Sequence, residues 1–234
     1  MARGTTLSSL RDQLRAELGA SSSVAMGVNS VPQMNHLLNR TQERIWTDFD
    51  WPFLLIEQDI QSQVGVRYYA VPQNINPDKI RKIMVKWNEF WYMCENGIGP
   101  EHYNVVDSDE GEMQDEVRRW RLWNEQTQIE VWPIPESTEQ TFRLFAYKKF
   151  NKMVSDDDVA LLDDTLIVLY TAAEMLASMK DEGAEIKYQQ AGLHFNKLKA
   201  SATKNSDFTM GGSISMADES TMGRKLWGKW KGTE

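Results

Sequence analysis

The residues best suited to binding lie near the C-terminal end of the chain, where basic and aromatic side chains alternate. Tryptophan rings and positive charges together can stack on and attract nucleic acid, or they can enter an acidic groove on a partner protein. We predict docking to a partner, because two tryptophans are costly on a tail that touches nothing. Nucleic-acid binding and a merely solubilising tail are the alternatives. The predicted docking residues are Arg224, Lys225, Leu226, Trp227, Lys229, Trp230 and Lys231.

Patterns that would support catalysis or metal binding are weak. His36, His102 and His194 stand far apart in the sequence and have no cysteine or carboxylate at metal-ligand spacing. The acidic run 107–111 has its glycine at the fifth position, whereas a calcium loop requires it at the sixth, so we predict a solvated loop. Neither a phosphate-binding glycine loop nor a nucleophile elbow is found. We therefore predict no catalytic residue, no metal and no cofactor.

The overall composition argues against a protein whose main task is to hold nucleic acid. The 234 residues carry a net charge of −8, whereas such binding requires clustered positive charge. An acidic wall could still surround DNA and let it slide. Cys94 is the only cysteine, which excludes an intrachain disulfide, and no apolar run is long enough to span a membrane. We expect a soluble protein with no membrane partner.

Helical periodicity marks the first part of the chain. Four leucines between Leu7 and Leu18 form one apolar stripe, and the segment from Gly19 to Asn29 is expected to be a flexible connection. A second helix is predicted from Ser30, with a capping box to Gln33, to about Phe49. Pro52 disfavours helical geometry at the residue before it, which predicts a helix end there.

The next hundred residues alternate as strands do. Alternation is clearest at 64–71, at 83–87, in a hairpin spanning 120–131 and at 142–147. Because strands that follow one another through short turns pair antiparallel, we predict an antiparallel sheet. The acidic stretch 107–116 is expected to be an exposed loop between strands.

A second helical block is predicted to begin after the run Ser155 to Asp158, whose aspartates are interpreted as a cap. Asp163 or Asp164 can also cap a helix there, and a break is predicted at Gly183. The helical pattern stops at Ser201. The predicted fold class is α+β: an antiparallel helical bundle from N- and C-terminal helices, with an inserted antiparallel β domain and an extended C-terminal tail. The predicted boundaries are 1–29 for an N-terminal amphipathic helix with a flexible connection, 30–53 and 155–200 for the bundle, 54–154 for the insert and 201–234 for the tail.

An ordered set of motifs resembles the head-to-tail adaptor, or connector, proteins of tailed bacteriophages. The motifs are LLNRTQERIW at 37–46, DWPFL at 50–54, RYYAVP at 67–72, IEVWPIP at 129–135 and DDDV at 156–159. A helix at 166–176 containing Tyr170, Ala172, Ala173 and Glu174 follows them. The resemblance covers about residues 31–200.

The resemblance implies a structural virion protein at the head-to-tail interface, assembled in the host cytoplasm. Such adaptors form a homo-oligomeric ring of twelve copies that binds the portal protein, receives tail or nozzle proteins, and extends the channel through which genomic DNA passes without sequence-specific binding. The C-terminal tail of the family reaches the portal. Two other functions are weighed against this one: a nucleic-acid-binding module that uses Trp227 and Trp230, and a cell-wall hydrolase that uses Glu101 or Glu112 with Asp107.

Overall fold

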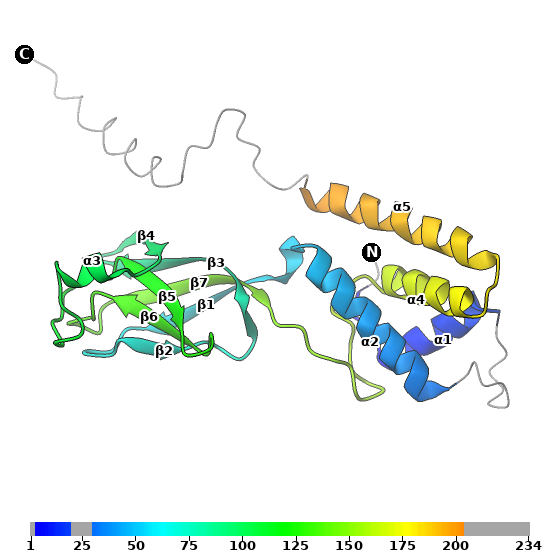
Figure 1. Cartoon of the computed structure of the whole chain (residues 1–234), viewed down its shortest axis with the longest axis horizontal. Helices are drawn as coiled ribbons and strands as arrows, with labels where there is room; N and C mark the ends of the chain where they lie inside the picture. Colours follow the sequence, from blue (N-terminus) through cyan, green and yellow to red (C-terminus); the bar gives the residue numbers. More distant parts are fainter. Residues whose placement is uncertain (1–2, 20–29, 204–234) are drawn as a thin grey trace, which may run out of the picture. The chain divides into compact units, whose positions relative to one another are not determined.

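The computed structural model describes residues 3–19 and 30–203. Within them the chain forms five α-helices, a short 3-10 helix and one seven-stranded sheet (Figure 1). The described residues separate into two compact units: a helical unit with segments up to Ile56, Gln73–Lys79 and Ala146 to Thr203, and a sheet unit with Glu57–Pro72 and Ile80–Phe145. In the described ranges, no helix is both long enough and apolar enough to cross a bilayer.

The helical unit contains α1 (Leu7–Glu17), α2 (Val31–Asp48), the 3-10 helix η2 (Pro52–Leu54), α4 (Asp164–Ser178) and α5 (Gly183–Thr203). These helices confirm the predicted periodicity, the helix end before Pro52 and the break at Gly183. Asp163 caps α4, since its Oδ1 accepts a hydrogen bond from the backbone N–H of Leu166 at 3.1 Å. The capping box predicted at Ser30 is wrong, because the Ser30 side chain makes no capping hydrogen bond.

The core of the helical unit is built around α4, which contacts α1, α2 and α5. Leu7, Leu10 and Leu14 are fully buried in this core, as the leucine stripe predicts. Backbone pairing also holds the N-terminal segment in place: the N–H of Leu7 donates to the carbonyl of Asp158 at 2.8 Å, and the N–H of Ala160 donates to the carbonyl of Thr5 at 3.0 Å. The first helix is therefore an integral part of the helical unit.

The sheet has the strand order β1-β7-β3-β4-β5-β6-β2. The strands are β1 (Leu55–Gln61), β2 (Tyr68–Ala70), β3 (Ile75–Trp87), β4 (Phe90–Asn96), β5 (Arg119–Trp123), β6 (Gln128–Trp132) and β7 (Thr141–Lys148), and a short helix α3 (Pro100–Tyr103) lies between β4 and β5. The predicted hairpin is confirmed as β5 and β6, with Trp120 opposite Val131. A tight turn joins β3 to β4, because Asn88 and Glu89 both adopt positive φ, of 47° and 68°.

The predicted fold class is wrong. An antiparallel helical bundle with an inserted antiparallel β domain was expected, but the sheet is mixed: β4 and β5 pair in parallel, with Glu95 opposite Arg119 and Asn96 opposite Trp120. The seven strands also supply an extensive core, so the sheet is not a small insert. The physical reason is the long connection from Gly97 to Arg118. It is long enough for the crossover that parallel strands need, whereas the prediction assumed short turns throughout.

One face of the sheet carries the core of the sheet unit. Buried side chains from β2, β3, β6 and β7 meet there, and the rings of Tyr69 and Phe142 pack edge to face with centroids 5.2 Å apart. The buried residues are Tyr69, Ile83, Val85, Ile129, Val131, Phe142 and Leu144.

We expect Leu10→Ala to lower the free energy of unfolding by about 2–5 kcal/mol, because it leaves a cavity where α1 packs against α4. Ile186→Ala on α5 is the matched control: its side chain is 59% exposed, and a change within about 0.5 kcal/mol is expected. Urea denaturation of both variants measures the difference. Equal stabilities would contradict a core that includes α1.

Candidate interaction surfaces

The seven predicted docking residues between Arg224 and Lys231 lie outside the described residues. Their role in docking therefore stays a prediction. The described residues offer three features that can be built from their contacts: a buried charge cluster, a set of exposed aromatic side chains and a basic–aromatic surface on the helical unit.

The charge cluster is centred on Glu130, a fully buried carboxylate in β6. Arg67 donates from Nε to Glu130 Oε1 at 2.8 Å, and Arg121 donates from Nε to Oε2 at 2.6 Å. Strand register explains the arrangement, because Arg121 lies opposite Glu130 and Arg67 directly precedes the β2 residue paired with Glu130. A buried carboxylate requires such partners, since removing it from water unpaired costs several kcal/mol.

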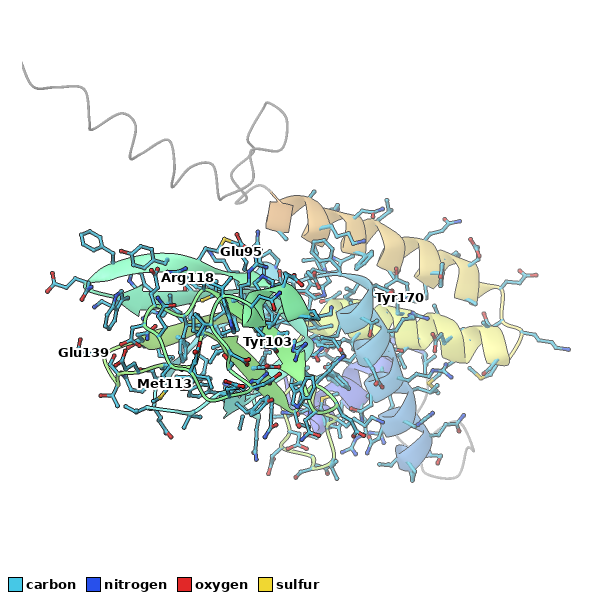
Figure 2. The ribbon with its side chains drawn as sticks, turned by 60° about the vertical axis from the view of Figure 1, so that its left-hand side comes forward. Glu95, Tyr103, Met113, Arg118, Glu139 and Tyr170 are labelled. Carbon is cyan, nitrogen blue, oxygen red and sulfur yellow. The ribbon has the colours of Figure 1, made fainter. Side chains whose placement is uncertain are left out.

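The same cluster fastens the long β4–β5 connection to the sheet. Tyr103 donates to Glu130 Oε1 at 3.2 Å, Arg67 forms an ion pair with Asp109 at 2.6 Å, and Arg121 donates to the carbonyl of Ile98 at 3.1 Å. Figure 2 labels Tyr103 among the side chains of the sheet unit. This connection, whose length permits the parallel pairing of β4 and β5, is therefore held against β5 and β6 by charge-assisted hydrogen bonds.

Burial and neighbouring charges act on two members of the cluster. Burial alone would lower the pKa of Arg67, but its hydrogen bonds to Asp109 and Glu130 outweigh burial and raise that pKa, so the guanidinium stays charged. Burial raises the pKa of Tyr103, and the negative charge of Glu130 raises it further. The cluster is consequently a fixed structural ion network.

The acids nominated for a hydrolase lie in and near the same connection. Glu112 accepts a hydrogen bond from the Asp107 N–H at 2.9 Å, and Asp107 in turn accepts from the N–H groups of Asp109 and Glu110. Glu101 is largely exposed and lies 3.3 Å from the imidazole of its neighbour His102. The structure thus brings Asp107 and Glu112 together as acceptors of backbone hydrogen bonds, an arrangement that shapes the acidic loop.

Several large apolar side chains of the sheet unit are exposed. At the β3–β4 hairpin, Phe90, Trp91 and Met93 are 67%, 37% and 50% exposed. On β2 and β5, the rings of Tyr68 and Trp123 stack with centroids 6.1 Å apart while both remain exposed. Aromatic and methionine side chains are enriched at protein interfaces, so both groups suit contact with a partner. We call Phe90, Trp91 and Met93 the hairpin patch.

The helical unit has a basic–aromatic surface formed by α2, α4 and α5. Arg40 and Arg44 of α2 both form ion pairs with Glu174 of α4, at 2.6 Å for Arg44. Arg44 also lies over the ring of Tyr170, 5.1 Å from its centroid, and Tyr170 packs against Tyr188 of α5. Burial raises the pKa of the Tyr170 hydroxyl, and the nearby Tyr188 adds to the shift.

Most of these residues belong to motifs recognised in the sequence, but the sequence did not indicate which of them contact one another. Arg67 and Glu130 belong to two motifs more than sixty residues apart, as do Arg44 and Glu174 at an even larger separation. The only local signal was charge within otherwise apolar periodic segments. Such a signal marks a residue in need of a partner without saying which residue supplies it.

Two packed units with a structural ion network and exposed aromatic surfaces define a protein suited to assembly. Within ranges 3–19 and 30–203, no group of three or more histidine, cysteine, aspartate or glutamate side chains is placed to hold a metal ion. The family model described as SU10 adaptor protein matches residues 5–213, and the chain belongs to this family of bacteriophage structural adaptors. The predicted resemblance is thereby confirmed. No curated protein matches the chain.

Family membership places the protein in the virion, where it interacts with other structural proteins of the phage. The surfaces described above are among the parts of the described chain that suit such contacts. They are distributed over both units.

We expect Glu130→Gln to lower the free energy of unfolding by about 3–5 kcal/mol, because Arg67 and Arg121 lose the carboxylate that compensates their charge. Asp59→Asn is the matched control: it also removes a carboxylate paired with an arginine of the sheet unit, Arg143, but at an exposed position where ion pairs contribute little. Urea denaturation compares the two. A loss no larger for Glu130→Gln than for the control would show that the network is dispensable.

Proposed function

We propose that this adaptor forms a ring between the portal and the tail of the virion, extends the DNA channel and provides the platform to which the tail attaches. The observation that carries the proposal is the match of the adaptor family to residues 5–213, which covers every helix and strand of the structure. We propose a structural role without enzymatic activity or cofactor.

The ring would be a homo-oligomer of twelve copies. A closed ring uses a heterologous interface, in which one surface of each copy meets a different surface of the next. The basic–aromatic surface, and the exposed α5 residues Ile186 and Leu193, are two chemically distinct surfaces that suit such a contact. The net charge of −8 suits a passage through which DNA moves without sequence-specific binding.

The C-terminal tail would dock to the portal. Residues Arg224–Lys231 combine positive charge with two tryptophans, which fits an acidic groove between portal subunits. The hairpin patch of the sheet unit would contact tail or nozzle proteins, because exposed aromatic side chains at a rigid turn lose little conformational entropy on binding.

A chain that ends at Asn205 should keep its fold, because all described elements precede that residue, but should no longer bind the portal. A second variant that ends at Ser213 retains the whole family match and lacks only the later tail, and it should fail equally. Native mass spectrometry with the portal ring measures binding. The full chain of 27.0 kDa should add twelve copies per portal ring. Undiminished binding by both shortened chains would refute portal docking through the basic end.

Trp91→Ala combined with Phe90→Ala should leave portal binding intact and weaken binding of the tail or nozzle protein by tenfold or more, about 1.4 kcal/mol or above, because both side chains are exposed candidates for interface anchors. Val105→Ala is the control, since Val105 is 71% exposed on the same unit but lies outside the hairpin patch. Co-sedimentation of preformed portal–adaptor complexes with the tail protein gives the comparison. Equal binding by all forms would place the tail contact elsewhere.

A nucleic-acid-binding module is the second candidate, supported by the same basic and aromatic residues 224–231. It requires an affinity for DNA that falls steeply with salt concentration. Titration of the full chain with DNA at two salt concentrations decides between the candidates, since the connector function requires no such affinity. Failure to lyse peptidoglycan would remove the hydrolase alternative.

A further inference from the structure

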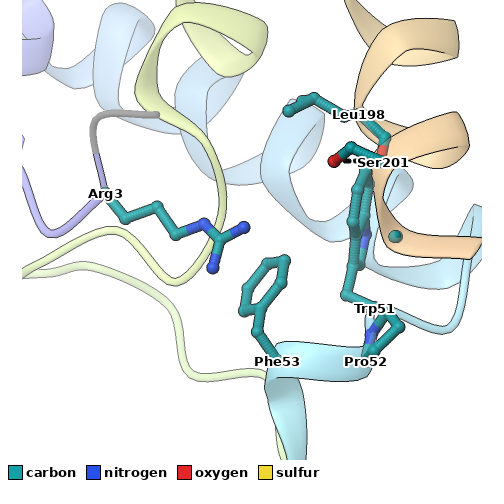
Figure 3. Close-up of a pocket in the computed structure, with 7 residues that line it drawn as sticks. Arg3, Trp51, Pro52, Phe53, Leu198 and Ser201 are labelled. Carbon is teal, nitrogen blue, oxygen red and sulfur yellow. Dashed lines mark hydrogen bonds between the residues drawn. The ribbon is translucent and has the colours of Figure 1, made fainter. Parts of the chain in front are cut away.

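A pocket of about 370 Å³ lies within the helical unit, where η2 meets the last turns of α5 (Figure 3). Trp51, Pro52 and Phe53 form one wall, and Leu198, Ser201 and Ala202 of α5 form the other. Trp51 is fixed in place, because its indole N–H donates to the carbonyl of Ile45 at 3.1 Å and only 3% of the residue is exposed. Trp51 is therefore a fixed wall of a recess that is lined mostly by apolar side chains.

A positive charge stands at the rim of this recess. The guanidinium of Arg3 lies over the ring of Phe53, 3.4 Å from its centroid, and Figure 3 shows it beside the pocket. An apolar recess with a cation at its edge is complementary to an aromatic side chain that has a carboxylate next to it.

We infer that this pocket binds the segment of the same chain that follows α5, with the ring of Phe208 inside the recess and the carboxylate of Asp207 at Arg3. Phe208 is the first large apolar residue after Leu198, and Asp207 is the only acidic residue between Glu185 and Asp218. The dipeptide thus has the two required chemical groups in adjacent positions.

The geometry of the chain supports this occupant. Ser201 and Ala202 line the pocket and are followed at once by the end of α5 at Thr203. Four residues separate Thr203 from Phe208, and the five steps along the chain can span up to about 17 Å, which is enough to turn back into a recess that begins on the same helix. A tethered occupant also has a high effective concentration, so modest contacts suffice to hold it.

The extent of the family match is an independent observation that favours the same segment. The match continues past the end of α5 to residue 213 and stops there, although the chain continues to Glu234. Gly211 and Gly212 directly follow Met210 and begin a run of small residues, Gly211 to Ser213, at which the match ends. Residues 204–210 therefore belong to the part of the chain that the family shares, as a segment bound to the body would.

The inference does not rest on portal docking. Anchoring at Phe208 sets the point from which the remaining tail departs, whatever that tail binds. It also limits the reach of Arg224–Lys231 to the length of chain beyond Met210.

Disulfide trapping in the full chain tests the inference. Pro52→Cys with Thr209→Cys places one thiol on the pocket wall and one beside Phe208, while Arg3, Asp207 and Phe208 stay intact. The control is Pro52→Cys with Thr221→Cys, which has the same wall position and a threonine farther along the tail. The native Cys94 does not interfere, because it is buried and burial raises its pKa to about 12.

The intrachain disulfide of the first pair should form at least about tenfold faster than that of the control, and adding Phe208→Ala should reduce its rate to the control level. Equal rates for the two pairs would overturn the inference. Disulfides formed between chains would overturn it as well, since they would show that a second copy occupies the pocket.

Hydrogen exchange gives a second readout without engineered thiols. Phe208→Ala should speed exchange of the Leu54 amide, which donates to the carbonyl of Trp51 at 2.9 Å beside the pocket, while Met222→Ala should leave it unchanged. Exchange within α4 shows whether the unit stays folded. The chain that ends at Ser213 separates the two proposals, because it keeps Phe208 but lacks the predicted portal-binding end. Its Leu54 amide should still exchange slowly. Fast exchange of that amide would contradict the binding of Phe208 in the pocket and would leave the portal proposal unaffected.

Discussion

Desolvation of the Glu130 carboxylate is the constraint on which the sheet unit depends. A fully buried charge is tolerated only when opposite charges and hydrogen bonds replace the lost water, and here Arg67, Arg121 and Tyr103 supply them. Arg67 directly precedes β2, Arg121 belongs to β5, and Tyr103 is the last residue of α3. Because β6 lies between β2 and β5, the hydrogen bonds to this one carboxylate hold both neighbouring strands against β6. It also holds down the long connection whose length permits β4 and β5 to run parallel.

The helical unit is organised by a different force. Its centre consists of apolar side chains of α1, α2 and α4, and its main ion pairs, from Arg40 and Arg44 to Glu174, lie at a partly exposed surface. Partly exposed pairs contribute less to stability than apolar burial does, so packing holds these helices together and the charges shape their surface. The arrangement leaves basic and aromatic groups of α2, α4 and α5 accessible to other proteins.

This division of tasks is consistent with a structural adaptor of a bacteriophage. Proteins that connect larger assemblies need rigid surfaces whose side chains are held before binding, because the ordering of loose side chains would reduce the binding free energy. The ion network of the sheet unit and the packed core of the helical unit both provide that rigidity. The exposed Phe90 and Trp91 extend from a turn fixed between two strands, which places aromatic side chains at a defined position.

Local features of the sequence determined the helices, the β5–β6 hairpin and the family, and they narrowed the cap of α4 to Asp163 or Asp164. Periodicity, capping residues and ordered motifs can be recognised within short stretches. Tertiary structure alone decided the rest. The parallel pairing of β4 with β5, the meeting of Arg67 with Glu130 and the pocket between Trp51 and Leu198 all join residues far apart in the chain. A short apolar or charged stretch shows that a residue must be buried or paired. Which partner a residue meets depends on the fold of the whole chain. A long connection such as the one after β4 is compatible with several strand pairings, and tertiary packing selects one of them.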